Sequence, residues 1–266
     1  MTLVLFILAA IAYGAATFAY GSQRDDDRDR DEGPRRWARL ALALGAVFHF
    51  AAIGAQCIEG DHPLKNIFLA TSFGTLVAVG SYLPLSGRGR LDALGALMAP
   101  LGLAGLVLGV VFSGLGKGTV PMAGGLPVAH VGFASVGFAG FALIAGVATL
   151  YLVAERRLRN KMFRPGRGGM SLTALDRLHH RLVLLVTPIF TVAIVTGVLW
   201  ILELGGPSMT SGRELEVTLA GIAWVASVGL LIARAARGTR GRRAAQLTLL
   251  AFAAILVIVV WYGVRP

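Results

Sequence analysis

Five histidines carry most of the metal-binding chemistry that this sequence could support: His49, His62, His130, His179 and His180. His49 and His130 each lie inside a long apolar stretch, with glycine or alanine about one helical turn away. Ionisable side chains in such stretches are costly to bury, and they usually have a partner or a function. An imidazole without a carboxylate or thiolate nearby suits a haem iron better than a hydrolytic zinc ion. The sequence therefore makes His49 and His130 candidate haem-iron ligands.

Two other interpretations of His49 and His130 remain open. Interior histidines can be held by hydrogen bonds alone, without any metal. They can also belong to a proton or ion path, although such paths usually include carboxylates, and the apolar stretches hold no deep Asp or Glu. Residue types and spacing alone do not decide among these three interpretations.

The other three histidines are weaker candidates. His179 and His180 stand between Arg177 and Arg181, and adjacent helical residues point about 100° apart, so the two are poorly placed to bind one metal. We interpret them as an interfacial basic cluster, with one of them a weaker candidate for an inner haem ligand. His62 precedes a proline that favours a turn, which indicates a surface loop; contact with an external ligand or a lipid head group is the alternative.

Catalytic and nucleotide-binding motifs are absent from the rest of the sequence. Cys57 is the single cysteine, which excludes an internal disulfide framework and a cysteine-built metal cage. Neither H-E-x-x-H nor a nucleotide-binding glycine motif is present, and no apolar stretch contains paired carboxylates. Trp200, Trp224 and Trp261 stand near the ends of apolar stretches, as in the aromatic belt of a membrane protein. We expect a protein that is not an enzyme.

The composition excludes a water-soluble domain. Hydrophobic residues make up 56% of the 266 residues and charged residues only 15%, against about 25% charged residues in soluble domains. A membrane-spanning helix needs about 20 mainly apolar residues. We therefore predict an all-α polytopic membrane protein, a single transmembrane domain over residues 1–266 surrounded by the lipid bilayer. Its eight predicted spans cover approximately 2–21, 38–57, 66–85, 91–113, 126–153, 175–202, 215–235 and 244–264.

Basic residues gather at one end of the predicted spans. The chain has 25 Lys and Arg against 14 Asp and Glu, and 21 of the 25 cations fall in or beside the loops after the first, third, fifth and seventh spans. Lys and Arg concentrate in cytoplasmic loops, which predicts that both termini lie on the extracytoplasmic side. The net charge of +11 is then a topology signal, and nucleic acid is not expected as a partner. Residues 22–37, a mixed run of Arg and Asp, are predicted to form a charged cytoplasmic loop.

Several motifs in the second half of the chain follow one another in a specific order. Leu126 to Phe133 place His130 at the start of a long apolar run, and Leu175 to Arg181 open the next run. Gly197-Val198-Leu199-Trp200 closes that run, and Arg240 to Arg243 precede the last one. This order resembles the cytochrome c assembly family, the CcsA and HemX-like integral membrane proteins. The first half agrees mainly in the number of helices, in topology and in the histidine of the second span.

The resemblance implies an eight-helix haem-handling protein of the bacterial cytoplasmic membrane, with haem b as its cofactor. It also implies that His130 matches the family's histidine on the extracytoplasmic side, and that a second membrane subunit is a partner. The sequence departs from the family pattern between Trp200 and Trp224, where a tryptophan-rich segment for presenting haem is missing, and at Ile232, where a histidine often stands. These departures favour a HemX-like role in haem supply or regulation over a full cytochrome c synthase.

We therefore expect His49 and His130 to lie across one pocket in the extracytoplasmic half of the bundle, in a protein that carries or presents haem. Two hypotheses compete with this one. The first is an electron-transfer cytochrome with a second haem at His179 or His180. The second is a scaffold or transporter without a cofactor, in which every histidine is structural.

Overall fold

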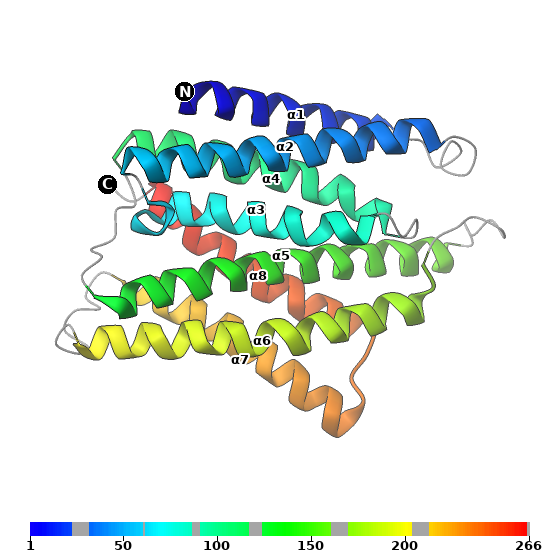
Figure 1. Ribbon diagram of the computed structural model, residues 1–266. Helices are drawn as coiled ribbons and strands as arrows, with labels where there is room; N and C mark the ends of the chain where they lie inside the picture. The colour runs from blue at the N-terminus through cyan, green and yellow to red at the C-terminus, as the bar shows by residue number, and fades with distance from the viewer. Residues whose placement is uncertain are drawn as a thin grey trace.

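The computed structural model describes residues 1–22, 32–60, 62–86, 91–116, 124–160, 170–203 and 213–264. These residues form eight α-helices, each long and apolar enough to cross a membrane (Figure 1). The helices are α1 (Thr2–Ser22), α2 (Glu32–Glu59), α3 (Ile67–Ser86), α4 (Asp92–Gly114), α5 (Gly125–Arg159), α6 (Leu172–Glu203), α7 (Glu214–Arg237) and α8 (Arg242–Val264), with a 3-10 turn, η2 (Pro63–Lys65), before α3. The predicted all-α membrane fold with eight spans is confirmed.

Two helices extend well beyond their predicted spans. α2 begins at Glu32 rather than at residue 38, and α5 continues to Arg159 rather than ending at residue 153. The added turn of α5 is rich in Glu, Arg and Leu, which form helices well although hydropathy assigns charged residues to loops. Part of the predicted loop 22–37 is therefore helical, and residues 23–31 lie outside the described part of the chain.

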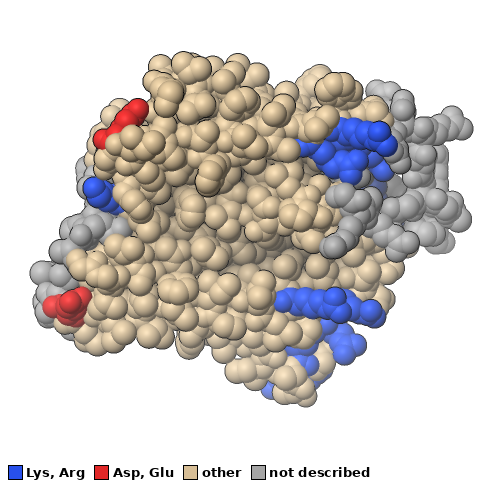
Figure 2. All heavy atoms as spheres, viewed as in Figure 1, with Lys and Arg blue, Asp and Glu red and all other residues tan. Residues whose placement is uncertain are grey.

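α1 begins and α8 ends at the same end of the bundle, on the left in Figure 1. We name this the terminal end; it holds the starts of α1, α3, α5 and α7 and the ends of α2, α4, α6 and α8. At the opposite end, named the basic end, Lys and Arg form the two large blue groups of Figure 2. Of the described cations, the terminal end holds Lys65 and Arg213. The charge asymmetry predicted from the sequence is therefore present in the folded protein.

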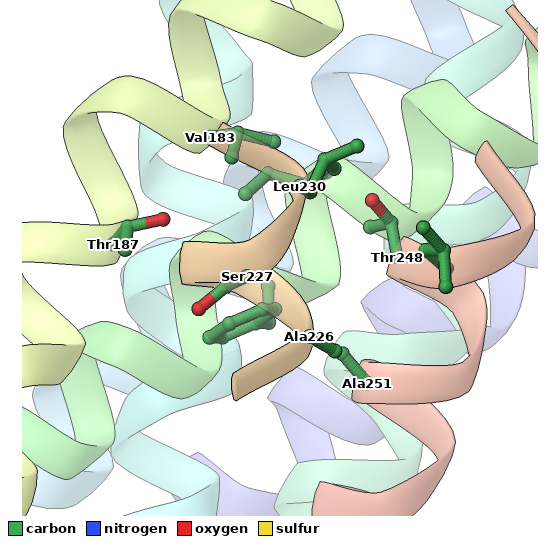
Figure 3. A pocket seen from close by; sticks show the side chains of 10 residues that line it. Val183, Thr187, Ala226, Ser227, Leu230, Thr248 and Ala251 are labelled. Atoms are coloured by element: carbon green, nitrogen blue, oxygen red, sulfur yellow. The ribbon is translucent and has the colours of Figure 1, made fainter. Parts of the chain in front are cut away.

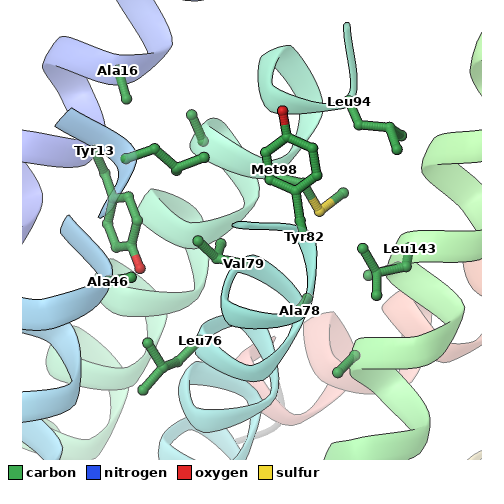
Figure 4. Packing of buried hydrophobic residues seen from close by; sticks show 14 of the residues in the cluster. Tyr13, Ala16, Ala46, Leu76, Ala78, Val79, Tyr82, Leu94, Met98 and Leu143 are labelled. Carbon is green, nitrogen blue, oxygen red and sulfur yellow. The ribbon is translucent and has the colours of Figure 1, made fainter. Parts of the chain in front are cut away.

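Two clusters of buried residues hold the bundle together, and α5 contributes to both. The first joins α1 to α5 around Tyr13, Tyr82 and Met98 (Figure 4). Small residues let the helices approach closely there: a Cβ at Gly105 of α4 would overlap the side chain of Thr75 of α3. The second cluster joins α5 to α6, α7 and α8, and it supplies much of the wall of the candidate site.

A partly buried ion pair links α6 to α7 at the basic end, and its carboxylate also binds the start of α8. Asp176 of α6 accepts hydrogen bonds of 3.2 and 2.7 Å from the guanidinium of Arg234 on α7. It also accepts a 3.0 Å hydrogen bond from the backbone N–H of Gly241, just before α8. Gly241 has a φ of +68°, and Tyr151 of α5 occupies the space where a Cβ would stand. These contacts join α6, α7 and the start of α8 at the basic end.

Candidate ligand-binding site

A cavity of about 390 Å³ lies between α3, α5, α6, α7 and α8, in the half of the bundle near the terminal end. This volume falls in the range of about 300–1,000 Å³ that is common for small-molecule sites. Most of the wall is apolar. Its ionisable, hydroxyl and indole side chains are those of Thr71, His130, Ser135, Trp200, Arg213, Glu216 and Tyr262. A cavity of this kind suits a ligand with a large apolar body and a small polar part.

His130 is the one histidine among the described residues that line the cavity. Its Nδ1 lies 2.8 Å from the backbone carbonyl oxygen of Ala193 on α6. Because a carbonyl oxygen only accepts hydrogen bonds, Nδ1 carries the proton and the lone pair is on Nε2. Nε2 has no hydrogen-bond partner among the described residues. Metal-binding histidines usually donate their other ring N–H to a carbonyl or carboxylate, so His130 is held in the tautomer of a metal ligand.

Gly197 and Trp200, one turn apart on α6, form the surface against which the His130 ring lies. A Cβ at Gly197 would stand 2.8 Å from Cε1 and Nδ1 of His130, so only glycine leaves room for the ring in this position. The Trp200 ring has its centroid 5.9 Å from that of the imidazole. The Gly-x-x-Trp spacing is visible in the sequence. Its contact with His130 depends on how α6 packs on α5, and hydropathy does not reveal that packing.

Charged and hydroxyl groups lie at the end of the cavity closest to the terminal end of the bundle. Arg213 precedes α7, and Glu216 lies in the first turn of that helix. The hydroxyl of Tyr262 on α8 donates a 2.7 Å hydrogen bond to Oε2 of Glu216. This bond joins α7 to α8, and Arg213 adds a cation that can form a charge-assisted hydrogen bond with a ligand carboxylate. Neither Arg213 nor Tyr262 was predicted as a site residue from the sequence.

His49 does not line this cavity and is fully buried elsewhere. Its Nδ1 lies 3.3 Å from the Tyr13 hydroxyl of α1, and its Nε2 lies 2.8 Å from the Ser72 hydroxyl of α3. Ser72 contacts His49, whereas its neighbour Thr71 borders the cavity, so α3 faces both regions. The sequence predicted that His49 and His130 line one pocket. In the structure only His130 lines this cavity. The structure shows His49 as a hydrogen-bonded interior histidine, which is one of the other interpretations that the sequence left open, and haem ligation by His49 is untested.

His179 forms a buried hydrogen bond at the basic half of the bundle. Its Nε2 lies 2.9 Å from the Thr248 hydroxyl of α8. Thr248 donates its one hydroxyl proton to the Ala244 carbonyl at 3.1 Å, so it accepts the bond from His179. Thr248 also borders a cavity of about 10 Å³ with Thr187 and Ser227 (Figure 3). That volume is close to the least that one water molecule needs.

Of the predicted locations of the other histidines, the surface position of His62 is confirmed, whereas the buried His179 does not belong to an exposed basic cluster. His180 is partly exposed while His179 is buried, as expected for neighbours that point in different directions. His62 is exposed, and its Nδ1 accepts a 3.2 Å hydrogen bond from the Leu64 N–H at the turn before α3. Within the described ranges, no group of three or more His, Cys, Asp or Glu is arranged to hold a metal ion. Much of the predicted short segment between Trp200 and Trp224, residues 204–212, lies outside those ranges.

Comparison with known proteins places the cavity in a recognised family region. The family model described as cytochrome c assembly protein matches residues 125–265. This region contains α5 to α8, and thus His130 and four of the five helices that line the cavity. No curated protein and no solved structure matches the chain. Because the family match spans more than half of the chain, the protein belongs to the cytochrome c assembly protein family, which supports a role in cytochrome c biogenesis.

Proposed function

We propose that the protein binds one haem b in the cavity beside His130 and carries or presents it during cytochrome c biogenesis. The observation that carries this proposal is the state of the His130 ring. The Ala193 carbonyl holds its Nδ1–H, and its Nε2 lone pair has no partner among the described residues of a largely apolar cavity. Imidazole nitrogen is a common axial ligand of haem iron. The protein's work is then to hold and deliver the haem, without bond chemistry of its own.

The other residues of the cavity also fit a haem. Apolar walls exclude water from a porphyrin ring, and Arg213 supplies a cation for a propionate carboxylate at the end of the cavity. Trp200, beside His130, offers a flat aromatic surface in the same wall. In this family haem is cargo, so a site that binds it reversibly suits the role better than a closed one.

We also propose that the terminal end faces the extracytoplasmic side of the bacterial cytoplasmic membrane. The support is the concentration of Lys and Arg at the basic end, which is typical of the cytoplasmic side. The cavity then opens in the outer half of the bilayer. A second membrane subunit that receives or supplies haem belongs to the same proposal.

Titration of the purified wild-type protein with haem tests this function. We expect a Soret band that saturates at one haem per chain, with the spectrum of a histidine-ligated b-type haem. Absorbance that rises without saturation, as haem dissolves in detergent, would contradict haem binding. Two haems per chain with reversible reduction by quinol would instead favour the electron-transfer cytochrome.

A further inference from the structure

The cavity beside His130 reaches the lipid-facing surface along one side. Among the described residues that line it, Val198 of α6 and Val217 of α7 are the exposed ones, at 50% and 48%. The lining residues of α3, α5 and α8 are buried or partly buried. The two exposed valines belong to α6 and α7, which follow each other along the chain, and both line the cavity. The cavity is therefore bordered by lipid-facing residues along the seam between α6 and α7.

Of the helices that border the cavity, α6 and α7 pack less closely on each other than α6 packs on α5 or α7 packs on α8. α6 has its most extensive contacts with α5, and α7 has its most extensive contacts with α8. The contact between α6 and α7 is less extensive than either. Gly221 of α7, which lines the cavity, leaves further open space on this side, because a Cβ built at this position meets no atom within 4 Å.

The seam lies in the half of the bundle near the terminal end. At 1.5 Å per residue, Val217 and Gly221 stand roughly 5 and 11 Å inside the start of α7, and Val198 roughly 8 Å inside the end of α6. The hydrocarbon core of a bilayer is about 30 Å thick, whereas the 32 residues of α6 and the 24 residues of α7 span roughly 48 and 36 Å. Val198 and Val217 therefore stand near the edge of the core at the terminal end, and Gly221 stands inside it. Arg213, just before α7, stands nearer the water boundary of the same cavity.

We propose that the α6–α7 seam is a lateral opening through which the cavity exchanges its ligand with the leaflet at the terminal end. This inference rests on the proposed function, because the occupant to which it commits is haem dissolved in that leaflet. Val198 and Val217 form the two sides of the opening, and Gly221 keeps it wide. The apolar body of the ligand then moves sideways from lipid to the cavity wall, while its carboxylates stay near Arg213 and the water boundary.

Substituting Gly221 with leucine tests the opening, because a Cβ at this position meets no atom within 4 Å and the longer side chain adds bulk beside the seam. Gly229→Leu is the matched control: it lies two turns further along α7, its Cβ also meets no atom within 4 Å, and it does not line the cavity. Each protein is reconstituted in nanodiscs of phosphatidylethanolamine and phosphatidylglycerol. Haem is supplied from vesicles of the same lipids, and the Soret band is followed in time.

We expect Gly221→Leu to slow both loading and release of haem by about tenfold. Haem uses the same path in both directions, so an added barrier slows both rates and leaves their ratio, the Kd, nearly unchanged. Val217→Ala should widen the seam and speed both rates, and Gly229→Leu should behave as wild type. Wild-type rates in Gly221→Leu would overturn the lateral opening while leaving haem binding intact. Lower haem affinity that comes from faster release alone would also overturn the lateral opening, because the leucine would then only take up space in the cavity that haem needs. If wild type binds no haem, the proposed function itself fails.

Discussion

Replacing His130 with alanine is expected to weaken haem binding by more than about 100-fold. Loss of a residue that only hydrogen-bonds to a metal ligand already costs about 10–100-fold, and loss of the ligand itself should cost more. The reason is that His130 supplies the one imidazole on the cavity wall among the described residues, with Nε2 free of protein partners. The measurement is a haem titration of the purified variant, followed by the Soret band. The characteristic bands of histidine ligation should disappear even where some haem stays in the apolar cavity.

His49→Ala is the informative comparison for this experiment. Both ring nitrogens of His49 lie at hydrogen-bond distance from hydroxyls, so we expect its removal to leave the haem spectrum unchanged. It should lower the thermal midpoint of unfolding instead, because unpartnered Tyr13 and Ser72 hydroxyls cost about 1–3 kcal/mol. A Soret band that survives in His130→Ala and vanishes in His49→Ala would reverse the assignment of the ligand.

Gly197→Ala should weaken haem binding by about tenfold. Disturbing the residues that orient a metal-binding histidine typically lowers affinity by about 10–100-fold, and this is the lower end of that range. The added Cβ would lie 2.8 Å from Nδ1 and Cε1 of His130, so the ring must move away from the Ala193 carbonyl that holds it. Alanine favours a helix by about 1 kcal/mol over glycine, so a loss of affinity would not come from a weaker α6.

Gly229→Ala serves as the control for Gly197→Ala, because its new Cβ meets no atom within 4 Å. Haem Kd and the thermal midpoint of unfolding are measured for both variants. Equal haem affinity in Gly197→Ala and wild type would show that the contact between α6 and the His130 ring has no part in ligand binding.

Hydropathy and charge were sufficient to predict most of the fold. Apolar runs fixed the eight spans to within a few residues at most ends, because burial in lipid requires apolar length whatever the tertiary packing. The errors fall where charged residues continue a helix, as in the last turn of α5 near Arg159 and the first turn of α2 near Glu32. Hydropathy treats such residues as loop, although Glu, Arg and Leu favour a helix at the end of α5 and a proline is compatible with the first turn of α2.

The candidate site was predictable only in part. His130 could be found from its depth, its small neighbours and the family resemblance, and the structure places it on a cavity. The prediction that His49 and His130 share a pocket was wrong, because hydropathy gives no information about which helices are neighbours. His49 lies away from the cavity, at hydrogen-bond distance from Tyr13 and Ser72. Gly197 is important because of its contact with a residue of another helix, and Arg213 because of its position at the end of the cavity. No pattern within a single span contains that information.

The most direct test of the central claim is rescue of His130→Gly by free imidazole. If Nε2 of His130 is the iron ligand, imidazole should enter the space left by the side chain and restore the histidine-type spectrum in a saturable way. His130→Phe, which fills that space, should not respond at the same imidazole concentrations. An equal response of the two variants, or no response of His130→Gly, would contradict haem ligation by His130 in this cavity.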